Sequence, residues 1–134
     1  MSYDRPNRQK YAFFYDAGNT ANETFTVKGP KGKSGRLYDY GIEGVTEAFT
    51  QDASLAIGTA ADPDHFGEEL AFGVVAVDTV ESLRTLYDPI ADKTSFDALL
   101  VQPDIPADTL VQMSIVDDAA TGIATFFCII DWAD

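Results

Sequence analysis

The residues most able to do chemistry lie together in one short stretch, IGTAADPDHFGEEL at residues 57–70. Asp62, Asp64 and His65, the only histidine of the chain, fall within four positions there. Carboxylates beside an imidazole are the side chains of metal sites and of general acid and base catalysis. However, His65 has no second histidine to complete a zinc or iron set, and no serine or cysteine partner can be identified from spacing.

A calcium loop of the EF-hand type that begins at Asp62 fails at its most important positions. Such a loop needs an oxygen ligand at position five and a bidentate carboxylate at position twelve. Here position five is Phe66 and position twelve is Gly73. A calcium site of another kind stays open, built from Asp62, Asp64, Glu68 and Glu69. Because aspartate followed by proline favours a turn, we expect this stretch to be a loop between two strands that holds no metal.

The remaining chemical motifs are incomplete. Gly32-Lys33-Ser34 has the ending of a phosphate-binding loop, but Val27 stands where the first glycine is required. Cys128, the only cysteine, has apolar neighbours and is expected to be a buried small side chain. No pair of carboxylates can be singled out for acid and base catalysis among 22 acidic residues. We therefore expect no catalytic residues, no cofactor and no enzymatic activity.

Charge is distributed unevenly along the chain. Residues 1–36 hold seven of the nine basic residues and three of the 22 acidic ones, although the net charge is −13. A phosphate-binding surface needs a basic patch, so this balance argues against nucleic acid as the main partner. No apolar run approaches the roughly 18 residues of a membrane helix, and the polar start predicts no secretory signal. We expect a protein that is made in a cytoplasm and does not bind a membrane.

The elements that must position these residues are mostly strands, because apolar residues recur at period two. We predict one antiparallel β-sandwich domain of jelly-roll type at residues 10–134. The one convincing helical pattern is DTVESLRTLYD at 78–88, where Val80, Leu83 and Tyr87 share a face. The expected strands lie at or near residues 11–15, 25–27, 36–49, 54–57, 70–77, 96–101, 109–116 and 123–132.

Finer features follow from the same pattern. Tyr38, Tyr40 and Ile42 are expected to share a face of their strand, and Gly41 and Gly44 to mark a bulge or bend. The last two strands are expected to form a C-terminal hairpin. Six aromatic residues are expected in the core, with a binding face as the alternative: Tyr11, Phe13, Phe14, Tyr15, Tyr38 and Tyr40.

Two segments suggest contact with a partner. The strand at 123–130 is apolar on both faces apart from Thr125, which fits a central strand or one that a partner covers. If Phe126 and Cys128 point inward, Phe127 and Ile129 form the centre of a contact with another copy; alternatively, loops or the helix at 78–88 cover them. Residues 1–9 are predicted to be a basic arm, with Arg5, Arg8 and Lys10 preceding the first strand and docking on an acidic neighbour.

Two longer stretches, at residues 29–64 and 103–132, are similar to known proteins. GPKGKSGRLYDYGIEGVTEAFT and the following LAIGTAADPD, with PDIPADTLVQMSIVDDAATGIATFFCIIDW near the end, resemble the head decoration or cement proteins of tailed bacteriophages. The similarity covers residues 29–64 and 103–132 and consists of turn signatures. It implies a β-sandwich that assembles as an oligomer, most plausibly a homotrimer, on the outer surface of the virion and stabilises the shell by binding the major capsid protein.

The candidate contact residues for the capsid or for other copies are Arg5, Arg8, Lys10, Lys31, Lys33, Phe127 and Ile129. A second function class has the same fold. A carbohydrate-binding β-sandwich module of a fibre or surface protein would use exposed tyrosines or Trp132 as stacking platforms. A small enzyme would need a polar cluster that the sequence does not display.

Overall fold

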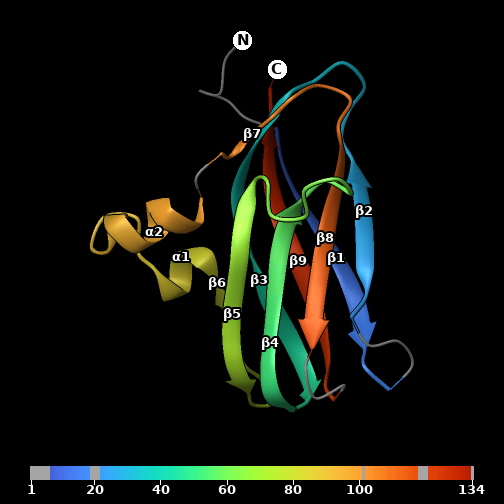
Figure 1. Cartoon of the computed structure of the whole chain (residues 1–134), viewed down its shortest axis with the longest axis vertical. Coiled ribbons are helices and arrows are strands. Elements are labelled where there is room, and N and C mark those ends of the chain that lie inside the picture. The colour runs from blue at the N-terminus through green and yellow to red at the C-terminus, as the bar shows by residue number, and fades with distance from the viewer. Residues whose placement is uncertain (1–6, 19–21, 101, 118–120, 134) are drawn as a thin grey trace.

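The computed structural model describes residues 7–18, 22–100, 102–117 and 121–133, and it shows an antiparallel β-sandwich (Figure 1). Strands hold 57% of the described residues and helices 9%, which confirms the all-β prediction. None of the helices in these ranges has the length and apolar character that a membrane span requires. In chain order the elements are β1 (Asn7–Asp16), β2 (Thr24–Lys28), β3 (Gly35–Glu47), β4 (Phe49–Gly58), β5 (Gly67–Val75), β6 (Glu81–Ser82), α1 (Leu83–Leu86), α2 (Lys93–Leu99), β7 (Asp104–Ile105), β8 (Leu110–Asp117) and β9 (Ile123–Trp132).

The strands follow a jelly-roll-like order. One sheet has the order β1-β9-β3-β6, with the short β7 beside β3, and the other has the order β2-β8-β4-β5. Four antiparallel pairs are nested within one another: β4 with β5, β3 with β6, β2 with β8, and β1 with β9. A long hairpin that is rolled up on itself produces this nesting, and most consecutive strands then fall in opposite sheets.

The predicted C-terminal hairpin is wrong for this reason. β8 lies between β2 and β4, whereas β9 lies between β1 and β3 in the other sheet. The turn-forming residue types at 117–122 indicate that the chain reverses there. They do not determine whether the next strand pairs with the previous one or crosses to the facing sheet, because that choice depends on strands far away in sequence.

The register of β3 changes at Tyr38. Leu37 pairs with Ile130 and Asp39 with Ile129, so Tyr38 is the extra residue of a bulge. Leu37 therefore faces the core before the bulge, and Tyr40 after it. The prediction that Tyr38 shares a face with Tyr40 and Ile42 is wrong, because one inserted residue reverses the side of every side chain that precedes it.

The expected bend near the glycines of β3 is also present. A second register shift lies between Glu43 and Glu47, and Gly44 within it has a positive φ of 58°. This left-handed backbone conformation is accessible to glycine at little cost. The pairing of the strand is thus irregular at this point, which agrees with the predicted bulge or bend.

The helical region differs from its prediction. Within residues 78–88 only Leu83–Leu86 are helical, and the cap is Ser82, whose hydroxyl accepts from the Thr85 amide. Asp78 has a positive φ of 67°, so it does not begin a helix. The predicted strand at 96–101 is wrong, since these residues largely belong to α2. A short apolar run is compatible with the two-residue period of a strand and with the 3.6-residue period of a helix. Here Phe96 packs into the core from the helix α2.

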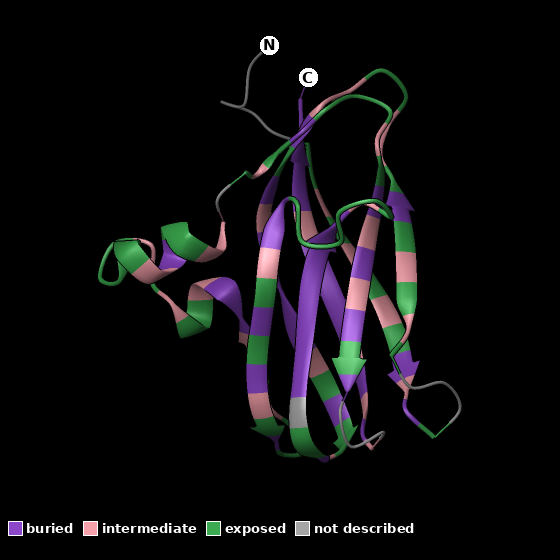
Figure 2. Cartoon of the chain, in the orientation of Figure 1, coloured by how far each residue is buried: buried purple, intermediate pink, exposed green. Residues whose placement is uncertain are grey.

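Buried residues occur along the strands of both sheets (Figure 2), and the buried apolar side chains form one core cluster. Tyr15, Phe49 and Phe126 meet at its centre with ring centroids 5.5 to 6.1 Å apart. Tyr11, Phe13 and Tyr15, three of the six aromatic residues expected in the core, belong to it or pack against it from alternate positions of β1. The helices α1 and α2 lie beside the sandwich, next to β3, β5 and β6 (Figure 1).

Candidate functional site: the outer face of the β1-β9-β3 sheet

The face of the β1-β9-β3 sheet that points away from the core, called the outer face below, brings four predicted contact residues together. In the antiparallel register Lys10 lies opposite Ile129, Ala12 opposite Phe127, and Arg8 opposite Asp131. Directly opposite residues of antiparallel strands share a face, so these side chains form neighbouring rows. The alternate residues Phe126 and Cys128 are fully buried in the core. Phe126 and Cys128 therefore point inward, and Phe127 and Ile129, which alternate with them, face outward as expected.

Phe127 is covered within its own chain, being only 5% exposed. The Nζ atom of Lys10 lies 4.5 Å from the centroid of the Phe127 ring and forms an ion pair with Glu43. Because Lys10 belongs to β1 and Glu43 to β3, this pair crosses over β9 above the ring. The ammonium group is attracted to the aromatic face, and the lysine stem covers apolar surface. A partner centred on Phe127 would have to displace this pair.

Arg8 makes more contacts within the chain than Lys10 does. Its Nε and Nη2 atoms donate to the two carboxylate oxygens of Asp131 at 2.6 and 2.8 Å. The guanidinium carbon also lies 3.6 Å from the centroid of the Tyr38 ring. Hydrogen bonding to Asp131 raises the pKa of Arg8 above its ordinary value. This geometry is a bidentate ion pair stacked on an aromatic ring.

The predicted arm at residues 1–9 therefore needs a correction. β1 begins at Asn7, so Arg8 and Lys10 do not precede the first strand but form part of it. Both side chains find acidic partners on strands that are remote in sequence, which local composition could not reveal. Arg5 lies outside the described residues.

The most accessible apolar side chain of the outer face is Phe14. It is 65% exposed and lies opposite Thr125 of β9, which in turn lies opposite Glu43 of β3. The expectation that Phe14 belongs to the core is wrong. The signal was present in the sequence, because Phe14 alternates with Phe13 and Tyr15, whose face is the buried one.

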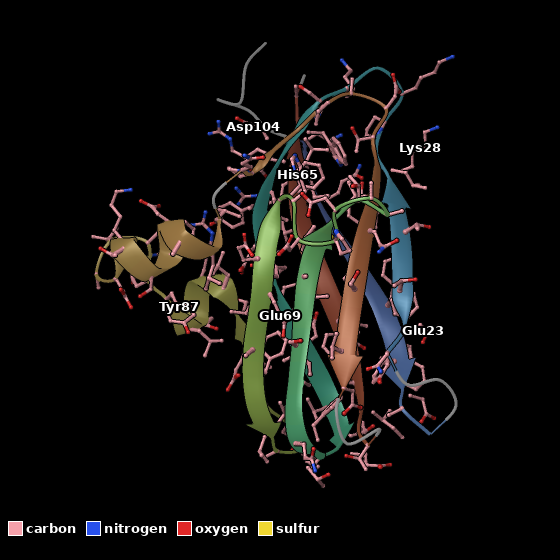
Figure 3. All side chains as sticks on the ribbon, viewed as in Figure 1. Glu23, Lys28, His65, Glu69, Tyr87 and Asp104 are labelled. Carbon is pink, nitrogen blue, oxygen red and sulfur yellow. The ribbon has the colours of Figure 1, made fainter. Side chains whose placement is uncertain are left out.

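Lys31 and Lys33 lie away from the outer face, in the turn between β2 and β3. Figure 3 shows the neighbouring Lys28 at the same end of the sandwich as His65. In this turn the Gly32 amide donates a hydrogen bond of 2.9 Å to the carboxylate of Asp108. Among the described residues, none of these three lysines forms an ion pair. They are available to attract an acidic partner at the end of the sandwich.

The stretch around Asp62 is a loop between β4 and β5, as predicted. The Nδ1 atom of His65 lies 3.2 Å from Oδ2 of Asp62. An open cavity of about 290 Å³ is lined by Asp62, Asp64, His65, Glu68 and Gln102.

The carboxyl groups of this cavity interact with each other. Hydrogen bonding with Asp62 and Glu68 lowers the pKa of Asp64, and hydrogen bonding with Asp64 raises the pKa of Glu68. Carboxyl groups that share a proton behave in this way. In the described part of the chain, no group of three or more histidine, cysteine, aspartate or glutamate side chains is arranged to hold a metal ion.

Trp132 does not form the stacking platform that a carbohydrate-binding module would need. Its indole is buried, and the indole N–H donates to the Tyr11 hydroxyl at 2.8 Å. Gly29 and Gly35 pack flat against the ring, since a Cβ atom at either position would come within 2.6 Å of it. Cys128 is a buried side chain, as predicted, and burial raises the pKa of its thiol to about 12.

The outer face thus combines an exposed phenylalanine, half-buried apolar neighbours and two ion pairs, Arg8 with Asp131 and Lys10 with Glu43. Such a surface is suited to contact with another protein surface, because apolar area is available and these four charges already have partners. Comparison of the chain with models of known protein families and with curated proteins found no match.

Proposed function

We propose that this chain is a structural protein of a tailed-phage virion that decorates and stabilises the capsid shell. In this proposal its outer face lies against the major capsid protein on the outer surface of the shell. The protein acts by binding and not by catalysis, and it assembles with further copies of itself, for which the resemblance to cement proteins implies three.

The observation that carries this proposal is the exposed apolar surface of the outer face. Phe14 is 65% exposed on a regular strand, and Ile123, Thr125 and Ile129 on the same face of the neighbouring strand β9 are half-buried. The helices α1 and α2 lie at the side of the sandwich, next to β5 and β6. Burial of an exposed aromatic side chain is a common source of energy at the centre of protein interfaces.

The resembling segments also support the proposal. Residues 29–64 and 103–132 contain β3, β4, β8 and β9, which are interior strands of the two sheets. The similarity to cement proteins therefore falls on the strands that build the sandwich and on the turns at its ends. The acidic remainder of the surface would face solvent, where a net charge of −13 discourages unspecific association.

The experiment is a binding measurement on capsid shells that lack their decoration protein, using co-sedimentation of purified shells and chain. Thr125→Arg places a long charged side chain in the middle of the outer face, on a half-buried position of the central strand β9. Ser114→Arg is the matched control, because Ser114 is half-buried on the outward side of β8 in the other sheet. We expect Thr125→Arg to weaken shell binding at least tenfold, or about 1.4 kcal/mol, and Ser114→Arg to leave it within about twofold.

Two outcomes would overturn the proposal. One is a wild-type chain that does not sediment with shells, and the other is equal weakening by both variants. A glycan array examines the remaining function class, and specific retention of the wild-type chain by a glycan would favour a carbohydrate-binding module instead.

A further inference from the structure

We infer that the free edge of β1 pairs with β1 of a second copy, antiparallel and across a twofold axis centred on Ala12. This contact is a property of the chain by itself and does not depend on shell binding. It is carried by the position of β1, by the direction of its basic side chains and by the order of residues along its outer side.

β1 is a long edge strand with a regular backbone. Within the described residues it pairs only with β9, at one end of the strand order of its sheet. All ten of its residues are in register with β9 without a bulge. An edge of this length presents a row of unpaired backbone N–H and C=O groups, which is a template for another strand. Bulges and proline, which commonly protect such edges, are absent from Asn7–Asp16.

The basic residues of β1 do not block this edge. Lysine on an edge strand often prevents pairing, because the charge extends into the path of the incoming strand. Here Lys10 crosses back over β9 to Glu43, and Arg8 reaches back to Asp131 of β9. Both cationic groups therefore point into their own sheet, and the backbone of β1 remains accessible.

The outer side of β1 is complementary to itself when the strand is reversed. Its residues in order are Arg8, Lys10, Ala12, Phe14 and Asp16. With Ala12 opposite Ala12 of the second copy, each Lys10 lies opposite Phe14 and each Arg8 lies opposite Asp16. Arg8 and Lys10 keep their own partners Asp131 and Glu43, so only the base of the Lys10 stem flanks the Phe14 ring of the second copy, and each Asp16 lies on the side of the contact that holds Arg8. Opposite-charge and aromatic pairs of this kind stabilise antiparallel strands.

Pairing in this register would join the two sheets into one continuous sheet through β1. Directly opposite residues share a face, so the two outer faces would lie on the same side. Phe14, the most exposed aromatic residue of the described chain, would pass from solvent into the contact. The twofold contact predicts a dimer, in contrast to the trimer that the resemblance implies.

The test is a symmetric disulfide. Directly opposite residues of antiparallel strands have Cα atoms about 4.5–5.5 Å apart, within the range of about 4.4–6.8 Å for disulfides. We expect Ala12→Cys to form a covalent dimer under mild oxidation at least tenfold faster than Ala71→Cys. Ala71 is the control because it is an exposed alanine on β5, the edge strand of the other sheet. Cys128 is buried and present in both variants.

Light scattering on the wild-type chain supplies the second measurement. A wild-type mass of twice 14.5 kDa supports the inference. Phe14→Lys should reduce this mass towards that of one chain, and Leu110→Lys on β8 should not. A monomer or a trimer at tens of micromolar, or equal oxidation rates of the two cysteine variants, overturns it. A dimer that cross-links through Ala12→Cys but binds no shell supports this inference and overturns only the proposed function.

Discussion

Phe14 and Phe127 show how far two similar residues on one surface can differ. Both side chains point away from the core, one from β1 and one from β9. Phe127 sits on the central strand, where the Lys10 and Glu43 side chains from the two flanking strands close over it. Phe14 sits on the edge strand, which has a neighbour on one side only. Position in the sheet therefore decides which ring is available to a partner.

We expect Phe127→Asp and Phe14→Asp to have very different effects on stability. A carboxylate at the buried position loses the apolar contacts of the ring and needs solvation, so Phe127→Asp should lower the free energy of unfolding by several kcal/mol, of the order of 3–5. At protein concentrations low enough for the chain to be monomeric, Phe14→Asp should change it by no more than about 0.5 kcal/mol. Urea unfolding, monitored by tryptophan fluorescence, measures the free energy of unfolding of both variants. Equal losses would mean that the two rings have the same environment.

At the scale of elements, the two helices are attached to the sheet through Arg84. The Arg84 amide donates to Asp39 at 3.1 Å, and Nε donates to the Tyr38 carbonyl at 2.8 Å. Its guanidinium carbon lies 3.7 Å from the Tyr38 ring centroid and 5.1 Å from that of Phe96 in α2. Burial raises the pKa of Asp39, although hydrogen bonds from Ser82, Arg84 and Tyr40 oppose that rise. The bulge of β3 thus provides the docking point for α1 and α2.

Replacement of Arg84 by alanine should loosen the helical segment and leave the sandwich intact. The backbone bond to Asp39 remains possible in Arg84→Ala, but the side-chain bond and the two ring contacts are lost, which together cost about 1–3 kcal/mol. We expect faster amide hydrogen exchange and faster protease cleavage within residues 83–99. Exchange in β3 and β9 should change little. Uniform acceleration across the whole chain would instead indicate that the helices and the sandwich unfold as one unit.

At the scale of the whole molecule, buried tyrosines couple stability to alkaline pH. Burial raises the pKa of Tyr15 to about 12, and the nearby Asp117, which accepts a bond from its hydroxyl at 3.2 Å, acts in the same direction. Burial also raises the pKa of Tyr40 and Tyr11. In the unfolded chain a tyrosine ionises near pH 10. The folded state therefore holds these protons more tightly than the unfolded state.

The contribution of these tyrosines to stability should consequently be constant below about pH 10, and stability should fall between pH 10 and 12. The unfolded chain loses its tyrosine protons first, so each such tyrosine lowers the free energy of unfolding by up to about 1.4 kcal/mol per pH unit in that window. Urea unfolding at pH 9, 10 and 11 checks the decline, and Tyr15→Phe should make it less steep. A free energy of unfolding that stays level up to pH 11 would contradict this expectation.

The strand content, the inward side of Tyr11, Phe13 and Tyr15 on β1 and the loop around Asp62 all follow from the amino-acid sequence. These features are local, because the alternation of Tyr11, Phe13 and Tyr15 and the turn at Asp62-Pro63 act over a few residues. The outward direction of Phe127 and Ile129 was predictable for the same reason. The exposed position of Phe14 was also predictable from this alternation, although composition alone suggested the core.

Three features depend on the folded chain as a whole: which sheet each strand joins, where β3 changes register and which outward side chains are covered. The separation of β8 and β9 depends on pairing with β4 and β3, and the cover of Phe127 depends on Lys10 and Glu43 from two other strands. Arg8 likewise pairs with Asp131, 123 residues away. Such contacts arise from the way the hairpin rolls up, and short-range periodicity contains no information about partners at that distance.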